Sequence, residues 1–368
     1  MTVPTSTRAA VLTEHGKPLH LTEIPLPAEV EPGAALVHVS CATLCGTDVE
    51  IWSGKMSFPG MLPMVLGHEM VGEVVAVGAD TRDALGRDIE VGARIGWSES
   101  TCGECYGCVV LREPVACSRR GYGFLQRSDV HPFATAGLCE YAYVVPRAAK
   151  LLLPDEIPDN WAAMAGCAAK TVLRAFSYVG GLTGKRVVVQ GSGALGVFAT
   201  AVAHLSGAAK VITVGSPASR LTLAGEFGAD ATVDIAEGSE RIVERVTELT
   251  GGRGADLVMD FAGAPSVGRE AVAMAAQRGH VVIVGSTGPN SEPLPLGAVM
   301  GKELTVHGSL NGDISDYHKA IEFFSAFADR MPWNDLFGTP VGLSAASERI
   351  EAMHRLDEVK AVVDPRLP

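Results

Sequence analysis

The chain has 368 residues, of which 47% are hydrophobic, and a formal net charge of −12 from 30 basic and 42 acidic side chains. Two domains are expected at this length, because a single hydrophobic core stops growing at about 250 to 300 residues. The acidic balance and the lack of a long apolar run exclude a basic surface for nucleic acid and a membrane-spanning helix, so we expect a cytoplasmic protein that binds a small molecule.

Short β-like runs between glycines and prolines, such as AALVHVSCATLCG and MVGEVVAVGAD, occupy the chain to roughly residue 155 and predict a compact β domain. The segment DEIPDNWAAMAGCAAKTVLRAFSYVG then has helical spacing. After it, strand, glycine turn and helix alternate, as in RVVVQGSGALG, KVITVGS and ADLVMDFAG. Such alternation predicts an α/β protein with a doubly wound parallel sheet.

From about Gly308 the pattern changes again, to a helix over DYHKAIEFFSAFADR and a final strand in KAVVDP. We therefore assign residues 158–308 to the alternating α/β domain and residues 1–157 to the β domain. Residues 309–368 are expected to return to the β domain.

Three glycines after the first strand of the alternating region have the GxGxxG spacing of a dinucleotide site: Gly191, Gly193 and Gly196, with Ala194 and Leu195 before the last. The first glycine permits a tight turn, the second lets the backbone approach a pyrophosphate, and the third lets the helix pack on the strand. The phosphate then lies at the helix N-terminus, where free N–H groups favour negative charge. A glycine turn without a nucleotide is the alternative.

The end of the next strand indicates which nucleotide is bound. Where an acid would bind the ribose hydroxyls of NAD, the run VITV is followed by Gly215 and Ser216. A 2′-phosphate would meet no carboxylate there, and Ser216 can donate a hydrogen bond while Arg220 supplies charge. We therefore expect NADP, with NAD as the alternative if Ser216 and Arg220 only cap and solvate the next helix.

Four of the eight cysteines crowd into one glycine-containing loop, at Cys102, Cys105, Cys108 and Cys117. Four thiolates so placed close a tetrahedral shell around zinc and leave no open position for chemistry, so this zinc is predicted to be structural. Disulfides are the alternative, which a reducing compartment disfavours.

A second set of zinc ligands is spread along the chain, with Cys45 in CGTD, His68 in GHE and Cys167 in AGCAAKTV. Two thiolates and one imidazole leave a fourth position of zinc open for a substrate oxygen, as a Lewis-acid catalyst requires. Each residue alone has an ordinary explanation as a small buried cysteine or a core histidine. Their occurrence with the nucleotide motif and the cysteine loop favours a catalytic zinc, and hence two zinc ions per chain.

These motifs together resemble the zinc-containing medium-chain alcohol and polyol dehydrogenases, over essentially the whole chain. The matching segments are CGTD at 45–48, GHE at 67–69, the cysteine loop, the cysteine after WAAMAG, the GxGxxG turn and the KAVVDP ending. The resemblance is nearest to bacterial sorbitol and cyclitol dehydrogenases. It implies a GroES-like catalytic domain with an inserted Rossmann domain, a homodimer or homotetramer, and hydride transfer between an alcohol and NAD(P).

The resemblance also implies roles for residues around the catalytic zinc. Cys45, His68 and Cys167 match its ligands, and Glu69 matches the carboxylate beside it. Asp48 matches an acid that orients the histidine ligand and raises its basicity.

Proton transfer is one of three places where the chain departs from the family pattern. Thr47 matches the hydroxyl that takes the substrate proton, but the outer relay position, often histidine, holds Glu50. A glutamate carboxylate, whose ordinary pKa is about 4.3, is a poor match to neutral pH unless its surroundings raise that pKa. The other departures are eight residues, not seven, between the last two cysteines of the loop, and the absent acid at Gly215.

Two other functions stay open from the sequence alone. A quinone or enoyl reductase of the same superfamily would keep the fold without zinc chemistry, and zinc content separates the two. A nucleotide-binding sensor or zinc-ribbon interaction protein is disfavoured by the acidic balance and by the open ligand set. The substrate is not predicted. Its pocket is expected to include Trp52, Met56, Phe58 and residues near 124–133, with ordinary core packing of these aromatics as the alternative.

Overall fold

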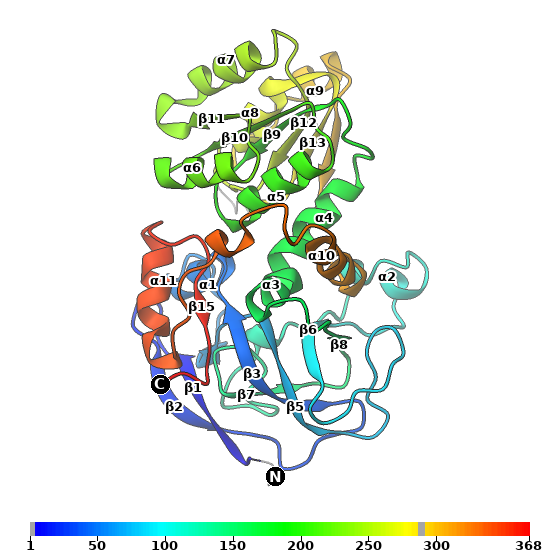
Figure 1. Ribbon diagram of the computed structural model, residues 1–368, viewed down its shortest axis with the longest axis vertical. Coiled ribbons are helices and arrows are strands. Elements are labelled where there is room, and N and C mark those ends of the chain that lie inside the picture. The colour runs from blue at the N-terminus through cyan, green and yellow to red at the C-terminus, as the bar shows by residue number, and fades with distance from the viewer. Residues whose placement is uncertain (1–3, 286–290) are drawn as a thin grey trace. The chain divides into compact units, whose positions relative to one another are not determined.

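A computed structural model describes residues 4–285 and 291–368, and the chain forms two compact units (Figure 1). Unit 1 comprises Met1–Lys170, Gly312–Ala326 and Leu336–Pro368, and unit 2 comprises Thr171–Asn311 and Phe327–Asp335. Units defined by contacts and domains defined by folding need not end at the same residue. The domain boundaries expected after residues 157 and 308 therefore stay a prediction.

Unit 1 is built on two antiparallel sheets, one with the strand order β15-β3-β5-β6-β8, in which β7 also pairs with β3, and one with the order β2-β1-β4. The strands are β1 (Ser6–Leu12), β2 (His20–Pro25), β3 (Ala35–Thr43), β4 (Met64–Val65), β5 (Glu69–Val77), β6 (Arg94–Ser100), β7 (Tyr141–Val144), β8 (Ala148–Leu152) and β15 (Val362–Val363). The central strand β3 is almost wholly buried, because it has strands or packed side chains on every side. The late strand β15 pairs with β3 at Thr43 and Ala42, so the KAVVDP segment lies in this sheet.

The α-helices of unit 1 lie between these strands along the chain and range from four to 13 residues. They are α1 (Gly46–Trp52), α2 (Tyr106–Val109), α3 (Asp159–Met164), α10 (Ile314–Ala326) and α11 (Ala346–His354), with 3-10 turns η1 (Pro114–Ala116), η2 (Gly123–Leu125) and η7 (Leu343–Ala345). The segment expected as one helix over 155–180 is three consecutive pieces: α3, a π-helical turn η3 (Ala165–Ala169) and α4 (Lys170–Ser177). Turns of this wide type often lie at functional sites.

Unit 2 holds six parallel strands in the order β11-β10-β9-β12-β13-β14, which confirms the predicted doubly wound sheet and the α/β class. The strands are β9 (Arg186–Gln190), β10 (Lys210–Gly215), β11 (Ala231–Asp234), β12 (Ala255–Asp260), β13 (Ala275–Ile283) and β14 (Thr305–Gly308). The helices are α5 (Ala194–Leu205), α6 (Ala218–Glu226), α7 (Ser239–Leu249), α8 (Val267–Met274) and α9 (Leu296–Gly301), with 3-10 turns η4 (Ile235–Glu237) and η6 (Trp333–Leu336).

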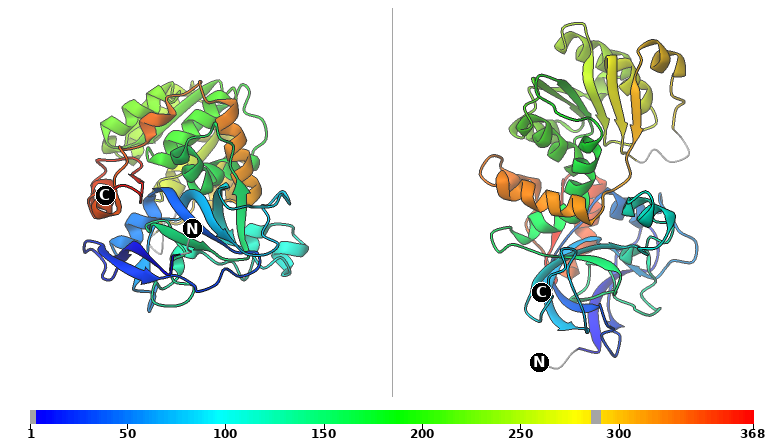
Figure 2. Two further views of the ribbon diagram at one scale, coloured as in Figure 1. Left: turned by 60° about the horizontal axis from the view of Figure 1, so that its bottom comes forward. Right: turned by 90° about the vertical axis from the view of Figure 1, so that its right-hand side faces the viewer.

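Helices cover both faces of this sheet, with α5 beside α6 and α7 beside α8 (Figures 1 and 2). The core strands are continuous valine, isoleucine and leucine runs, as expected for parallel strands buried on both faces. Trp333 packs its ring 5.6 Å from that of Phe198 and 5.7 Å from that of Phe227, which places residues 327–335 in unit 2. Among the residues that the structure describes, no helix combines the length and apolarity needed to cross a bilayer.

Candidate functional site

Four metal-ligating side chains converge within unit 1. Cys45, His68, Glu69 and Cys167 each offer one ligand atom, and these atoms all lie within 4.8 Å of one another. They come from three separate segments: the residue before α1, the start of β5, and the π-helical turn η3. The predicted convergence of the two cysteines and the histidine is therefore confirmed.

Asp48 holds two of the ligand segments together. Its fully buried carboxylate accepts the backbone N–H of Cys45 at 2.9 Å, which caps α1, and the backbone N–H of Gly67 at 3.0 Å. Its Oδ1 atom also lies 3.3 Å from Nδ1 of His68. The opposite ring nitrogen of His68, Nε2, lies 3.1 Å from Sγ of Cys45 and so faces the ligand cluster. This is the geometry that fixes an imidazole as a metal ligand.

Glu69 is buried beside the two thiols with one oxygen fully engaged and the other available. The ammonium of Lys360, itself inaccessible to solvent, forms an ion pair with Oε2, and the hydroxyl of Thr43 donates to the same oxygen. Oε1 is buried and has no hydrogen-bond partner among the described residues. A buried, unsatisfied carboxylate oxygen next to two sulfurs and an imidazole fits a bound cation.

The electrostatics of this cluster also fit a cation. A hydrogen bond from the Cys167 thiol lowers the pKa of Cys45 well below its usual range, with help from His68 and against the effect of burial. Burial lowers the pKa of His68, but the negative charges of Cys45, Asp48 and Cys167 outweigh it and raise that pKa. The surroundings therefore stabilise positive charge at the centre of the cluster, as a zinc site requires.

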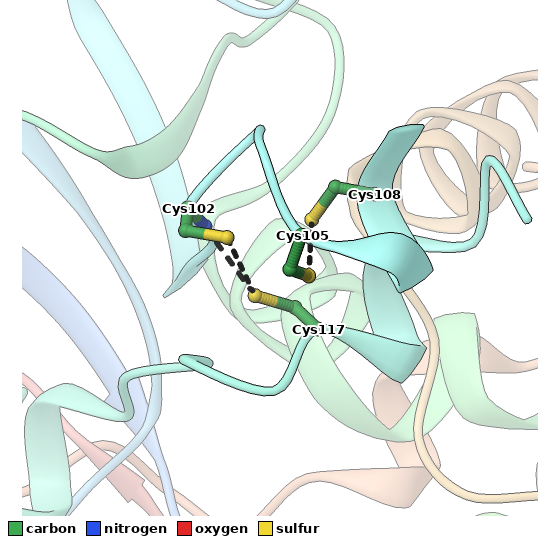
Figure 3. Close-up of side chains that lie close together, drawn as sticks. All are labelled: Cys102, Cys105, Cys108 and Cys117. Carbon is green, nitrogen blue, oxygen red and sulfur yellow. Dashed lines mark hydrogen bonds between the residues drawn. The ribbon is translucent and has the colours of Figure 1, made fainter. Parts of the chain in front are cut away.

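The four loop cysteines form a second cluster, whose ligand atoms also lie within 4.8 Å of one another (Figure 3). The Sγ atoms of Cys105 and Cys108 are 3.6 Å apart, and those of Cys102 and Cys117 are 3.5 Å apart. All four thiols are free, so the disulfide alternative fails. Backbone N–H groups of Cys108 and Ser118 lower the pKa of Cys105 to about 5, which favours a thiolate in the loop.

The longer spacing between the last two loop cysteines is accommodated without separating the sulfurs. Arg112, between these two cysteines, adopts a left-handed backbone with φ of 56°. The chain then returns so closely that a Cβ atom on Gly107 would overlap the carbonyl of Ala116. The loop thus turns sharply and still brings Cys117 to the cluster.

The glycine turn of unit 2 has the conformation expected of a dinucleotide site. Gly191 has φ of +113°, which favours glycine, and a Cβ atom on Gly196 would overlap the carbonyl of Gly191. Gly193 caps α5, whose first residues are Ala194 and Leu195, so their N–H groups lie at the positive end of the helix dipole.

The end of β10 leaves no room for a side chain at Gly215. The Ser192 hydroxyl donates to the Ser216 carbonyl at 2.9 Å and accepts the Ser216 N–H at 3.0 Å. A Cβ atom on Gly215 would overlap this hydroxyl. Arg220, in the first turn of α6, is 9% exposed.

Comparison with known proteins agrees with this geometry. The family of the alcohol dehydrogenase GroES-like domain matches residues 31–155, and that of the zinc-binding dehydrogenases matches residues 194–326. The 5-exo-hydroxycamphor dehydrogenase of Pseudomonas putida is 31% identical over 367 residues, which cover 98% of this chain and 99% of the relative. The crystal structure of an alcohol dehydrogenase from Thermotoga maritima superposes with a TM-score of 0.90 at 30% identity, over 98% of this chain and 100% of that one. A putative zinc-binding dehydrogenase from Sinorhizobium meliloti, bound to NADP, has a TM-score of 0.84 at 28% identity, over 98% and 100% of the two chains.

The chain belongs to the zinc-binding medium-chain alcohol dehydrogenase family. It is a zinc-dependent alcohol dehydrogenase with a catalytic and a structural zinc site, as the sequence predicted. The β domain is GroES-like and the parallel sheet is of Rossmann type, which confirms the predicted fold. Membership of the sorbitol and cyclitol subgroup stays a prediction.

Two residues of the dehydrogenase's predicted proton path lie on α1. Thr47 is half-buried in the first turn, and Glu50 is partly exposed and forms an ion pair with Lys55 at 3.1 Å. Their catalytic roles stay predictions. Sequence reasoning missed Lys360 and Thr43 as partners of Glu69, and a single sequence carries no signal that pairs these distant residues.

Proposed function

We propose that the enzyme interconverts a secondary alcohol, polyol or cyclitol with its carbonyl product, using NADP. The observation that carries this proposal is the convergence of Cys45, His68 and Cys167, which leaves one coordination position for a substrate oxygen. The relative named 5-exo-hydroxycamphor dehydrogenase supports an alcohol substrate. The zinc convergence also favours this function over a reductase of the superfamily that lacks zinc chemistry.

Cys45, His68 and Cys167 would hold zinc, which would supply Lewis acidity at a substrate oxygen, and a bound NADP would supply the hydride acceptor. In our proposal the Thr47 hydroxyl takes the substrate proton and Glu50 passes it towards solvent. Asp48 keeps the Nε2 atom of His68 aimed at the ligand cluster. Burial raises the pKa of Glu69, and the ion pair with Lys360 opposes that rise.

Thr47→Val is expected to lower kcat/KM by about 10²- to 10⁴-fold, the usual contribution of a positioned proton-transfer group. Thr47→Ser keeps the hydroxyl and is the matched control, expected to retain most of the activity. Steady-state kinetics at saturating zinc measure both. If Thr47→Val remains as active as Thr47→Ser, the proton is taken by another group.

NADP is proposed because Gly215 occupies the position where an acidic residue would bind the ribose hydroxyls of NAD. A side chain at this position would overlap Ser192. The S. meliloti relative that binds NADP supports the choice. Ser216, Arg220 and the turn residues Gly191, Gly193, Ala194, Leu195 and Gly196 are proposed to bind the nucleotide. The comparison of kcat/KM for the two nucleotides is expected to favour NADP at least tenfold, and a tenfold preference for NAD would contradict the proposal.

The crowding at Gly215 gives a sharper prediction for changing the nucleotide. Gly215→Asp alone is expected to lower kcat/KM with both nucleotides, because its Cβ atom would displace the Ser192 hydroxyl. Adding Ser192→Gly removes that overlap and is expected to shift the preference towards NAD, since a carboxylate then faces the ribose. Ser192→Gly alone is the control. If Gly215→Asp alone reversed the nucleotide preference, the end of β10 would have to move aside at little cost, which would contradict this prediction.

The remaining parts of the proposal concern substrate, assembly and location. A panel of polyols, cyclitols and simple secondary and primary alcohols, assayed with both nucleotides, identifies the substrate class.

We propose a homodimer or homotetramer, which light scattering of the purified protein tests. The free state of all eight cysteines supports a reducing, cytoplasmic compartment.

A further inference from the structure

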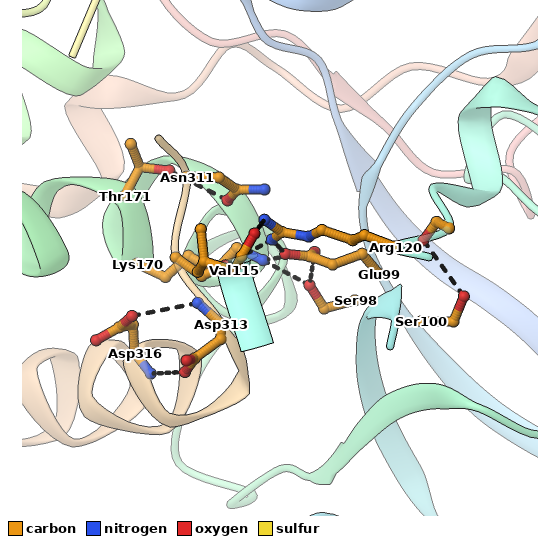
Figure 4. A network of polar contacts seen from close by, with 12 residues as sticks. Ser98, Glu99, Ser100, Val115, Arg120, Lys170, Thr171, Asn311, Asp313 and Asp316 are labelled. Carbon is orange, nitrogen blue, oxygen red and sulfur yellow. Dashed lines mark hydrogen bonds and ion pairs between the residues drawn. The ribbon is translucent and has the colours of Figure 1, made fainter. Parts of the chain in front are cut away.

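A buried ionic cluster in unit 1 lies outside the ligand sets of both zinc sites (Figure 4). Glu99 lies at its centre, with the guanidinium of Arg120 on Oε1 and the ammonium of Lys170 at 2.8 Å from Oε2. The three side chains are 8%, 6% and 1% exposed. We call Arg120, Glu99 and Lys170 the ionic triad.

The ionic triad connects chain segments that carry ligands of both metal sites. Each member lies three residues from a zinc ligand: Glu99 before Cys102, Arg120 after Cys117, and Lys170 after Cys167. The two ends of the structural cysteine loop are thus tied through Glu99 to the segment that carries the third ligand of the catalytic zinc.

Further contacts fix the triad on the loop side. Arg120 donates to the carbonyl of Val115, inside the cysteine loop, at 3.3 Å, and to the carbonyl of Gly312 at 3.0 Å. Its guanidinium also lies over the ring of Tyr122, 5.1 Å from the centroid. These contacts fix the guanidinium of Arg120. The fixed guanidinium in turn restricts the position of the Glu99 carboxylate.

On the catalytic side, Lys170 is the residue directly after the π-helical turn that carries Cys167. Its ammonium reaches back to Glu99 and to the Ser98 hydroxyl at 2.5 Å. A π-helical turn is a rare and less regular conformation, so the position of Cys167 depends on what anchors the ends of the turn. A buried ion pair is a strong anchor, because breaking it strands a charge away from water.

We propose that the ionic triad positions Cys167 for the catalytic zinc by fixing the end of η3 against the structural cysteine loop. Glu99, Arg120 and Lys170 are then positioning residues, and the structural site contributes to catalysis through them. This role does not depend on the nucleotide or on the alcohol that the enzyme uses.

The test follows the metal itself, in holoenzyme that has cobalt at the catalytic site and zinc at the structural site. Thiolate-to-cobalt absorption reports the geometry of the catalytic ligands, and its decay in excess chelator gives the rate of metal release. Glu99→Gln, Arg120→Met and Lys170→Met are each expected to shift the absorption band and to speed cobalt release about 10- to 100-fold, as loss of a ligand-orienting partner does. Lys170→Met leaves Glu99 paired with Arg120, so it gives a readout even if Glu99→Gln folds poorly.

The matched control is Glu104→Gln, which removes a carboxylate from the same loop but from an exposed pair with Arg119. Its cobalt release is expected to equal that of the wild type, and all variants are expected to retain the structural zinc. Release within twofold of wild type in Glu99→Gln and Lys170→Met would overturn the proposal. Wild-type cobalt release in Arg120→Met would also overturn it, because the cysteine loop would then have no part in positioning Cys167. Equal loss of both metals would overturn it as well, because it indicates general destabilisation.

Discussion

Replacement of Cys167 by alanine is expected to lower turnover about 10³-fold or more, because metal catalysis contributes several kcal/mol of transition-state stabilisation. The variant loses one of three protein ligands at the open zinc site, while the loop of four cysteines is unchanged. We therefore expect one zinc per chain instead of two, with nucleotide binding retained. Elemental analysis and fluorescence titration with the nucleotide measure these outcomes.

Cys139→Ala is the matched control for this experiment. Cys139 is buried and Cys167 partly buried, but the Cys139 thiol donates to backbone carbonyls and belongs to neither metal cluster. It is expected to retain both zinc ions and most of the activity. If Cys167→Ala kept two zinc ions and full turnover, Cys167 would have to be removed from the ligand set.

Lys360→Met is expected to lower the free energy of unfolding by about 3 to 5 kcal/mol, the usual cost of leaving one member of a buried ion pair without its partner. Glu69 and Lys360 are both inaccessible to solvent, so water cannot replace the lost ammonium. Burial already raises the pKa of Glu69, and Lys360 opposes that effect. Denaturant unfolding at a fixed zinc concentration measures the change.

The double variant Glu69→Gln with Lys360→Met separates a stranded charge from lost packing. Because it removes both charges, it is expected to recover much of the stability that Lys360→Met loses. A fall of less than about 1 kcal/mol in Lys360→Met itself would show that Glu69 has another counter-charge.

Motifs carried most of what could be predicted from the sequence. Cys45, His68 and Cys167 were recognisable because zinc chemistry demands particular residue types, and the glycine turn because its backbone demands glycine. Likewise, alternation of strands and helices is sufficient to indicate a doubly wound sheet.

The partners of these residues could not be predicted, because they depend on which distant segments pack together. A single sequence does not show that Lys360 is buried against Glu69. It also does not show that Glu99 forms ion pairs with Arg120 and Lys170 instead of being solvated. Charged residues are mostly exposed, so the ordinary expectation for each was a solvated side chain. The π-helical turn was not predicted either. It differs from an α-helical turn by one additional residue, and the hydrophobic spacing of the sequence does not reveal that residue.

The pairing of β15 with β3 has a consequence for biosynthesis. Cys45, His68 and Cys167 leave the ribosome well before Lys360, which precedes β15, has been translated. A nascent chain therefore holds the catalytic ligands for some time with Glu69 lacking its ammonium partner. The cysteine loop needs only residues 102–117 to supply all its ligands, so the structural ion can be captured first, whereas the catalytic site receives its last buried charge only near the end of synthesis.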